Sequence, residues 1–349
     1  MADERQAPEV SHPCCSINPD PEVGLPLSGQ LRYLMNMLRN PSNKLPWLIA
    51  LLVVAVYLPA LSASFQFDDW QVVLGDSRVT SFSAWWQSMP GMRALVKLSY
   101  ALNHEMGGEL GGGVEMFRAV NILIHALNAA LLFMLTQLLA RRLCASNDGA
   151  ATTVGAVTAL VFALHPAQTE SVTYISGRSN ALATLFVLLA LLVWLKSREK
   201  DAGWWMTPLS ALAFVAALAC KETTAVLPLA MLLCLAAEPN RPPLRDFIVP
   251  PTFAALAVLL FVATWTRLPY DYLLRVSLET RGPVENLAAQ SQGVIWLIGQ
   301  MFNWSRLNAD PMLQPVTQWT PGVILMTAAL AVVVAAGLLA LPLIIRGQG

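Results

Sequence analysis

Long apolar runs constrain this chain more than any other feature of its sequence. Each is roughly 16–26 residues long, about the length that crosses a bilayer as a helix. Hydrophobic residues make up 56% of the 349 residues and charged residues only 13%, with a mean hydropathy of +0.54. An ordinary soluble domain is about 45–50% apolar and about 25% charged. The composition therefore excludes a disordered or fibrous chain and most soluble enzymes, and it predicts an all-α, polytopic membrane protein.

The apolar runs predict a single transmembrane bundle of eight or nine spans over residues 46–349. Residues 287–302 are short and carry three glutamines, so they are either the ninth span or a helix lying flat on the membrane. Residues 1–45 are polar and proline-rich, and we expect a partly disordered cytoplasmic tail with no cleaved leader. The other predicted spans are 46–63, 115–139, 152–165, 180–195, 204–219, 224–237, 247–267 and 321–345.

Basic residues set the expected orientation of the bundle. Lysine and arginine gather in the tail and in alternate short loops, which the positive-inside rule places in the cytoplasm. The outer segments are then 64–114, 165–180 and 219–224. The large first outer loop carries an aromatic cluster, Phe82, Trp85 and Trp86, which predicts interfacial helices. Alanine- and leucine-rich spans favour a bacterial inner membrane with a periplasmic outer face.

Charge and cysteine content exclude further classes. Twenty-two basic residues balance twenty-two acidic ones, so no basic excess is present to bind nucleic acid. The five cysteines form no Cys-x-x-Cys pair, and an odd number cannot close a disulfide framework, so we expect free thiols.

An adjacent acidic pair, Asp68 and Asp69, follows the first predicted span among aromatic residues. A carboxylate at a membrane boundary can act as a general base on a hydroxyl nucleophile, or it can bind a cation. The alternative is a solvated acid that caps a helix.

A polar stripe marks the second predicted span. Arg118, Asn121, His125 and Asn128 fall within roughly an 80° arc of a helix. Such a stripe must face the bundle interior or a wet cavity, because lipid cannot satisfy it. The sequence leaves open whether these residues serve a site or only form hydrogen bonds between helices.

The other two outer segments add cations and carboxylates. The segment after the third span holds His165, Glu170, Tyr174 and Arg178. A tight hinge between two later spans holds Lys221 and Glu222, which are either part of a site or a local ion pair. Cations beside the bilayer suit a phosphate attached to a lipid, since arginine can bind phosphate with two hydrogen bonds.

Several short segments together resemble the membrane part of the transmembrane-and-tetratricopeptide-repeat O-mannosyltransferases, within the GT-C glycosyltransferases. The match rests on their order and spacing over about residues 46–240, and Arg93-Ala94-Leu95 stands where Arg-Pro-Leu is expected. These segments are Phe67-Asp68-Asp69, Leu98–Asn103, Val120–Leu127, His165–Glu170, Ser176-Gly177-Arg178 and Lys221-Glu222-Thr223.

The resemblance implies a GT-C-like fold and a role for each candidate residue. Asp68 would be the general base or would orient the acceptor, and Asp69 would support it or hold an ion. A divalent cation between Asp68, Asp69 and His165 is left open. The residues expected at the donor phosphate are Arg93, His165, Arg178 and Lys221. The residues expected to support the site are Arg118, Asn121, His125, Glu170, Tyr174 and Glu222.

The resemblance also implies an activity. The donor would be a sugar on a polyprenyl or dolichyl phosphate, most plausibly mannose or a related hexose. The acceptor would be a serine or threonine hydroxyl of a protein, with inversion at the sugar carbon. No repeat domain is recognisable in the sequence, so a partner subunit that presents the acceptor is one expectation. Two alternatives stay open: transfer to a lipid or envelope glycan, and a non-catalytic, lipid-binding or scaffold subunit. A transporter is disfavoured because the polar residues gather at the outer ends.

Overall fold

The computed structural model describes residues 44–88, 91–107, 113–143, 147–240, 242–265, 270–280, 282–302 and 320–346. Within these ranges the chain is helical and contains no strand, which confirms the all-α prediction. The predicted tail falls almost entirely outside the described residues.

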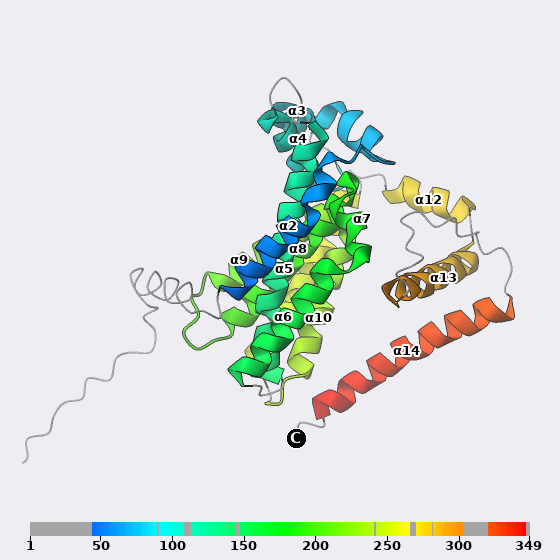
Figure 1. Ribbon diagram of the computed structural model, residues 1–349. Helices are drawn as coiled ribbons and strands as arrows, with labels where there is room; N and C mark the ends of the chain where they lie inside the picture. Colours follow the sequence, from blue (N-terminus) through cyan, green and yellow to red (C-terminus); the bar gives the residue numbers. More distant parts are fainter. Residues whose placement is uncertain are drawn as a thin grey trace, which may run out of the picture.

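Short connecting segments join successive helices, and the long helices of the bundle lie side by side (Figure 1). The longer helices are α2 (Leu45–Tyr57), α5 (Gly113–Leu143), α6 (Asp148–Leu164), α8 (Arg178–Ser197), α9 (Met206–Cys220), α10 (Leu227–Ala236), α11 (Val249–Trp265), α13 (Pro283–Phe302) and α14 (Pro321–Arg346). Helix α2 continues into η2 (Leu58–Ser62), and the first outer loop carries η3 (Trp70–Leu74), η4 (Ser77–Val79), α3 (Phe82–Ser88) and α4 (Ala94–Met106). The remaining short elements are η6 (Pro166–Gln168), α7 (Thr169–Val172), η7 (Ile175–Gly177), η8 (Glu222–Val226), η9 (Leu244–Phe247) and α12 (Tyr270–Thr280).

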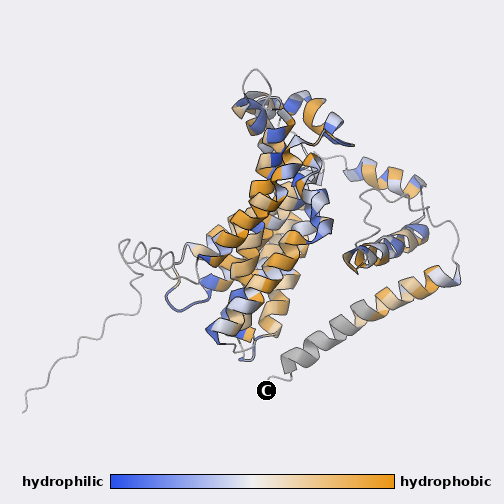
Figure 2. Cartoon of the chain, viewed as in Figure 1, coloured by the Kyte–Doolittle hydropathy of each residue, from blue (hydrophilic) through white to orange (hydrophobic). Residues whose placement is uncertain are grey.

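Helix α5 is the central helix of the bundle. It is 31 residues long and packs against α2, α6 and α8. Figure 2 shows apolar residues along the middle of the bundle and polar residues at its two ends, the pattern of a membrane protein. In Figure 1, α12, α13 and α14 stand to one side of this bundle.

Four helical segments are long and apolar enough to cross a membrane: Leu45–Ser62, Gly113–Leu143, Ile175–Ser197 and Leu244–Trp265. A fifth is counted if α6 and the following 166–172 segment, bent by 55°, form one span. Among the described residues three further apolar helices are shorter, and α13 is long enough but too polar to join the set. The membrane-protein class is therefore confirmed, while the count of eight or nine spans stays a prediction.

Small residues let α6 approach α5 closely. Ala151, Gly155, Ala159 and Ala163 recur every fourth residue on one face of α6, and all four are buried. A Cβ on Gly155 would lie 3.0 Å from the carbonyl oxygen of Phe133 in α5. Membrane helices pack through such small-residue faces, because hydrophobicity alone does not drive them together inside lipid.

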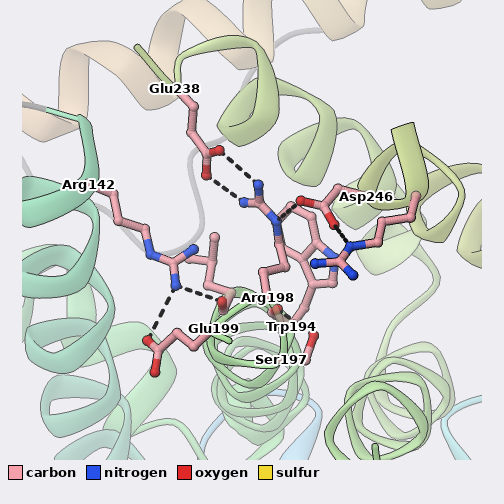
Figure 3. A network of polar contacts seen from close by, with 9 residues as sticks. Arg142, Trp194, Ser197, Arg198, Glu199, Glu238 and Asp246 are labelled. Atoms are coloured by element: carbon pink, nitrogen blue, oxygen red, sulfur yellow. Dashed lines mark hydrogen bonds and ion pairs between the residues drawn. The ribbon is translucent and has the colours of Figure 1, made fainter. Parts of the chain in front are cut away.

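An ion-pair network closes the end of the bundle opposite the first outer loop (Figure 3). Arg198 donates to Glu238 at 2.5 Å and to Asp246 at 2.7 Å, and its guanidinium lies over the ring of Trp194. Arg142 donates to Glu199 at 3.3 Å. Only 8% of the Arg198 side chain is exposed, so this network ties the ends of α8 and α10 to η9 with charges largely withdrawn from water.

We expect Arg198→Met to destabilise the protein by on the order of 3 kcal/mol, because Glu238 loses its partner and Asp246 keeps only the exposed Arg245, at 3.9 Å. Arg275→Met is the matched control, since its pair with Asp271 on α12 is largely exposed and should contribute about 0.5 kcal/mol or less. Thermal unfolding of the detergent-purified variants measures the difference. Equal melting temperatures would show that the ion-pair network around Arg198 does not stabilise the protein.

Candidate active site

Asp69 fastens the first outer loop to the bundle. It is fully buried, and its Oδ1 accepts hydrogen bonds from the backbone N–H and the hydroxyl of Ser176, both at 2.8 Å. Its Oδ2 accepts from the backbone N–H groups of Gln66 at 3.1 Å and Ile175 at 3.4 Å. These four donors satisfy a carboxylate whose burial would otherwise be costly.

Arg118 and Asn121 of α5 donate hydrogen bonds to the backbone of the segments on either side of this contact. Arg118 reaches residues 63–64 and 173, and Asn121 reaches residues 172 and 174. The guanidinium of Arg118 donates to the carbonyl of Thr173 at 2.9 Å and to the carbonyls of Ala63 and Ser64. The amide nitrogen of Asn121 lies 3.3 Å from the carbonyl oxygens of Val172 and Tyr174. Both side chains are buried, as the polar stripe predicts.

Arg178 completes this buried group. Its nitrogens donate to Asn121 Oδ1 at 2.6 Å, to Asn103 Oδ1 at 2.7 Å and to the carbonyl of Phe117 at 2.8 Å. Its guanidinium also lies 4.8 Å from the ring centre of Tyr100. We call Asp69, Arg118, Asn121 and Arg178 the polar anchor.

Tyr100 links the polar anchor to the first outer loop. Burial raises the pKa of Tyr100 to about 12, so its hydroxyl stays neutral and donates to the carbonyl of Ile175 at 3.2 Å.

Three further polar side chains, His125, Asn128 and His165, lie within hydrogen-bond distance of backbone carbonyl oxygens. His125 Nε2 lies 3.0 Å from the carbonyl oxygen of Ala163, and the ring packs edge-on to Tyr57. Asn128 donates to the carbonyl of Ala181 at 2.9 Å. His165 accepts from the N–H of Ala167 through Nδ1, so Nε2 carries the hydrogen and faces the carbonyl of Met301 at 3.1 Å.

Two adjoining clefts open above the polar anchor. The wide cleft has a volume of about 420 Å³ and the basic cleft about 220 Å³. Asp68, which is exposed, lines both clefts together with Glu170 and Tyr174. The wide cleft is completed by Gln66, Phe67, Thr169 and Thr173. The basic cleft is completed by Val72, Arg93, Val96, Lys97, Tyr100, Ser176, Gly177, Ser179, Asn180 and Lys221.

Three cations from two separate segments line the basic cleft: Arg93 and Lys97 at the start of α4, and Lys221 directly after α9. Burial lowers the pKa of Lys221 and that of Lys97. Lys221 donates to Asn180 Oδ1, and Lys97 lies 3.6 Å from Asp76. Our site prediction did not include Lys97, although it lies one helical turn after Arg93, a spacing that places two side chains on the same helix face.

The backbone around the clefts has two unusual residues. Phe67, just before the acidic pair, has φ +41°, and Arg93 has φ +58°, in the left-handed region that non-glycine residues seldom adopt. The Phe67 ring packs edge-on to Tyr174 at 6.0 Å. Strain of this kind is retained where the surrounding structure fixes it, and it clusters at functional sites.

Close packing also fixes the wall of the basic cleft that contains Glu170 and Gly177. A Cβ on Gly177 would lie only 2.3 Å from the carbonyl oxygen of Glu170, so only glycine lets these two segments meet.

The structure sorts the predicted residues into two layers. Asp68, Arg93, Glu170, Tyr174 and Lys221 line the clefts. The other predicted residues do not line them: Asp69, Arg118, Asn121, His125, His165, Arg178 and Glu222.

The described residues do not fit the cation considered between the acidic pair and His165. No group of three or more His, Cys, Asp or Glu side chains in that part of the chain is placed to hold a metal ion. Asp69 is occupied by Ser176, and His165 by backbone groups.

Residues 110–266 match the family described as "Dolichyl-phosphate-mannose-protein mannosyltransferase". The chain is similar to protein O-mannosyltransferases. It is 32% identical over 198 residues to protein O-mannosyl-transferase Tmtc1 of Drosophila melanogaster, covering 52% of this chain and 21% of that protein. It is 31% identical over 170 residues to human TMTC2, covering 44% and 19%. The chain thus spans about a fifth of the length of these relatives. No solved structure matches it.

These matches confirm the resemblance to GT-C glycosyltransferases noted in the sequence. The matched region 110–266 contains α5 to α11, and so it includes Glu170, Tyr174 and Lys221 of the clefts. Asp68, Arg93 and Lys97 lie before that region.

We expect Asp69→Asn to destabilise the protein by about 2 kcal/mol, because an amide nitrogen would then face backbone N–H donors. Asp68→Asn, one residue away and exposed, is the matched control and should stay within about 0.5 kcal/mol. Thermal unfolding, together with hydrogen exchange of the amides of residues 66–76, measures both. Equal stability and equal exchange in the two variants would contradict the anchoring role of Asp69.

Proposed function

We propose that the chain is a membrane glycosyltransferase that moves mannose or a related hexose from a polyprenyl-phosphate donor to a hydroxyl acceptor. One observation carries this proposal. An exposed carboxylate, Asp68, shares a cleft at the outer end of the bundle with three cations from two separate segments. The names of the relatives, protein O-mannosyl-transferases, support the same reaction class.

The cations of the basic cleft suit the phosphate of the donor. Among the ion pairs between described residues, Lys97–Asp76 at 3.6 Å is the one that involves a cation of this cleft. Arg93 and Lys221 therefore keep charge available for an anion. As the bond to the sugar breaks, negative charge grows on the leaving phosphate, and fixed cations stabilise that charge most in the transition state.

Asp68 is proposed as the general base. The acceptor hydroxyl attacks the sugar C1, a new C1–O bond forms, and the C1–O bond to phosphate breaks with its electron pair staying on the phosphate. The hydroxyl proton passes to Asp68. Attack from the face opposite the phosphate inverts C1. The rest of the proposal is a protein serine or threonine as acceptor, and a periplasmic site in a bacterial inner membrane.

The structure changes the roles that we propose for two predicted phosphate ligands. The nitrogens of Arg178 are occupied by protein oxygens, and it is fully buried, so we assign it to positioning the loops under the clefts. His165 binds backbone groups on both ring nitrogens and does not line either cleft, so we also leave it out of the phosphate site. Lys97 takes their place.

We expect Asp68→Asn to lower kcat by about 10²–10⁴-fold, because the acceptor proton loses its base. The assay offers polyprenyl-phosphate mannose and a serine peptide to the purified protein and measures release of the lipid phosphate. Asp271→Asn, an exposed change on α12, is the control and should retain full turnover. Equal turnover in the wild type and Asp68→Asn would rule out Asp68 as the base, and donor binding without turnover in both would favour the non-catalytic alternative.

The donor KM should rise at alkaline pH through the lysines of the basic cleft. Burial lowers the pKa of Lys97 and Lys221, so each is charged below its pKa and loses its charge at a lower pH than an exposed lysine. Losing a charge-assisted hydrogen bond of about 1.5 kcal/mol corresponds to about a tenfold rise in KM. The double variant Lys97→Arg with Lys221→Arg keeps both charges and should remove most of the rise between pH 7 and pH 10. An identical rise in the double variant would place the titrating group elsewhere.

A further inference from the structure

The two clefts that meet at Asp68 differ in charge. The basic cleft holds Arg93, Lys97 and Lys221, whereas none of the described residues that line the wide cleft is a cation. Two carboxylates, Asp68 and Glu170, line both clefts, and in the wide cleft they are accompanied by two threonine hydroxyls and the edge-on pair Phe67 and Tyr174 in place of cations. It is also the larger, at about 420 Å³ against about 220 Å³.

The direction of attack assigns these clefts to the two substrates, if the proposed function holds. A phosphate bound by the cations of the basic cleft leaves the sugar C1 near Asp68, where the clefts join. An inverting attack comes from the face of C1 opposite the phosphate. The acceptor therefore approaches through the wide cleft.

Glu170 is the carboxylate of this cleft that the proposed chemistry does not use. It lies on α7, and its backbone is held tightly against Gly177. Its side chain is exposed, and its charge interacts with that of Lys221 across the junction. Glu170 is thus a fixed negative charge beside the path of the acceptor.

We infer that the wide cleft selects a hydroxyl acceptor that carries a positive charge, and that Glu170 is the residue that determines this specificity. A serine or threonine flanked by lysine or arginine in a peptide fits this charge. A phosphorylated glycan or an anionic lipid does not, because two carboxylates repel it before it reaches Asp68.

The test compares three serine peptides that differ only in their flanking residues: lysine, glutamine or glutamate. The wild type at pH 7 should use the lysine peptide with a KM about fivefold below that of the glutamine peptide, the size of a partly exposed ion pair. Glu170→Gln should lose this difference with kcat little changed, and Glu170→Lys should reverse the order in favour of the glutamate peptide. Glu279→Gln on α12 is the control and should keep the wild-type preference.

The outcomes separate this inference from the function on which it rests. Turnover with the same KM for all three peptides, or a preference unchanged in Glu170→Gln, would overturn the inference alone. Sugar found in the lipid fraction instead of the peptides would also overturn it. No release of lipid phosphate with any peptide would overturn the proposed function, and this inference with it.

Discussion

The outer end of this protein depends on keeping a few buried charges satisfied. Asp69 and Arg178 are fully buried, and each would be expensive to remove from water without partners. Each is therefore surrounded by groups that match it: four donors for the carboxylate, and amide and carbonyl oxygens for the guanidinium. Because these partners come from the first outer loop, α5 and η7, satisfying the charges also fixes where the loops run.

The two adjacent carboxylates, Asp68 and Asp69, have opposite surroundings. Asp69 points inward and has its acceptors filled, while Asp68 is exposed at the junction of the clefts. The left-handed backbone at Phe67 and the turn of π-helix that begins at Trp70 flank this pair. The filled acceptors of Asp69 fix the backbone beside Asp68, which is the rigid support that the proposed general base needs.

The sequence predicts the parts of this arrangement that follow from periodicity. Apolar runs gave the helices, and the stripe on α5 correctly placed Arg118, Asn121 and His125 inside the bundle. Periodicity does not report how loops fold back. The family resemblance predicts Arg178 as a phosphate ligand, and only the fold shows that it is buried with its guanidinium over the ring of Tyr100. His165 meets Met301, 136 residues away, through a contact that no local pattern encodes.

The two ends of the bundle use the same charged residue types for opposite purposes. At the end that carries η9, Arg142, Arg198 and Arg245 each lie within 4 Å of an acidic partner, so the network is neutral and helps to lock the helix ends. At the opposite end three cations share one small cleft with two carboxylates, and both carboxylates also line the wide cleft with its threonine hydroxyls. A paired network contributes rigidity and attracts no ligand. Arg93 and Lys221 have no acidic partner within 4 Å among the described residues, so their charge can attract an anion, and that difference, more than the presence of charge itself, distinguishes the cleft end of this protein from its ion-paired end.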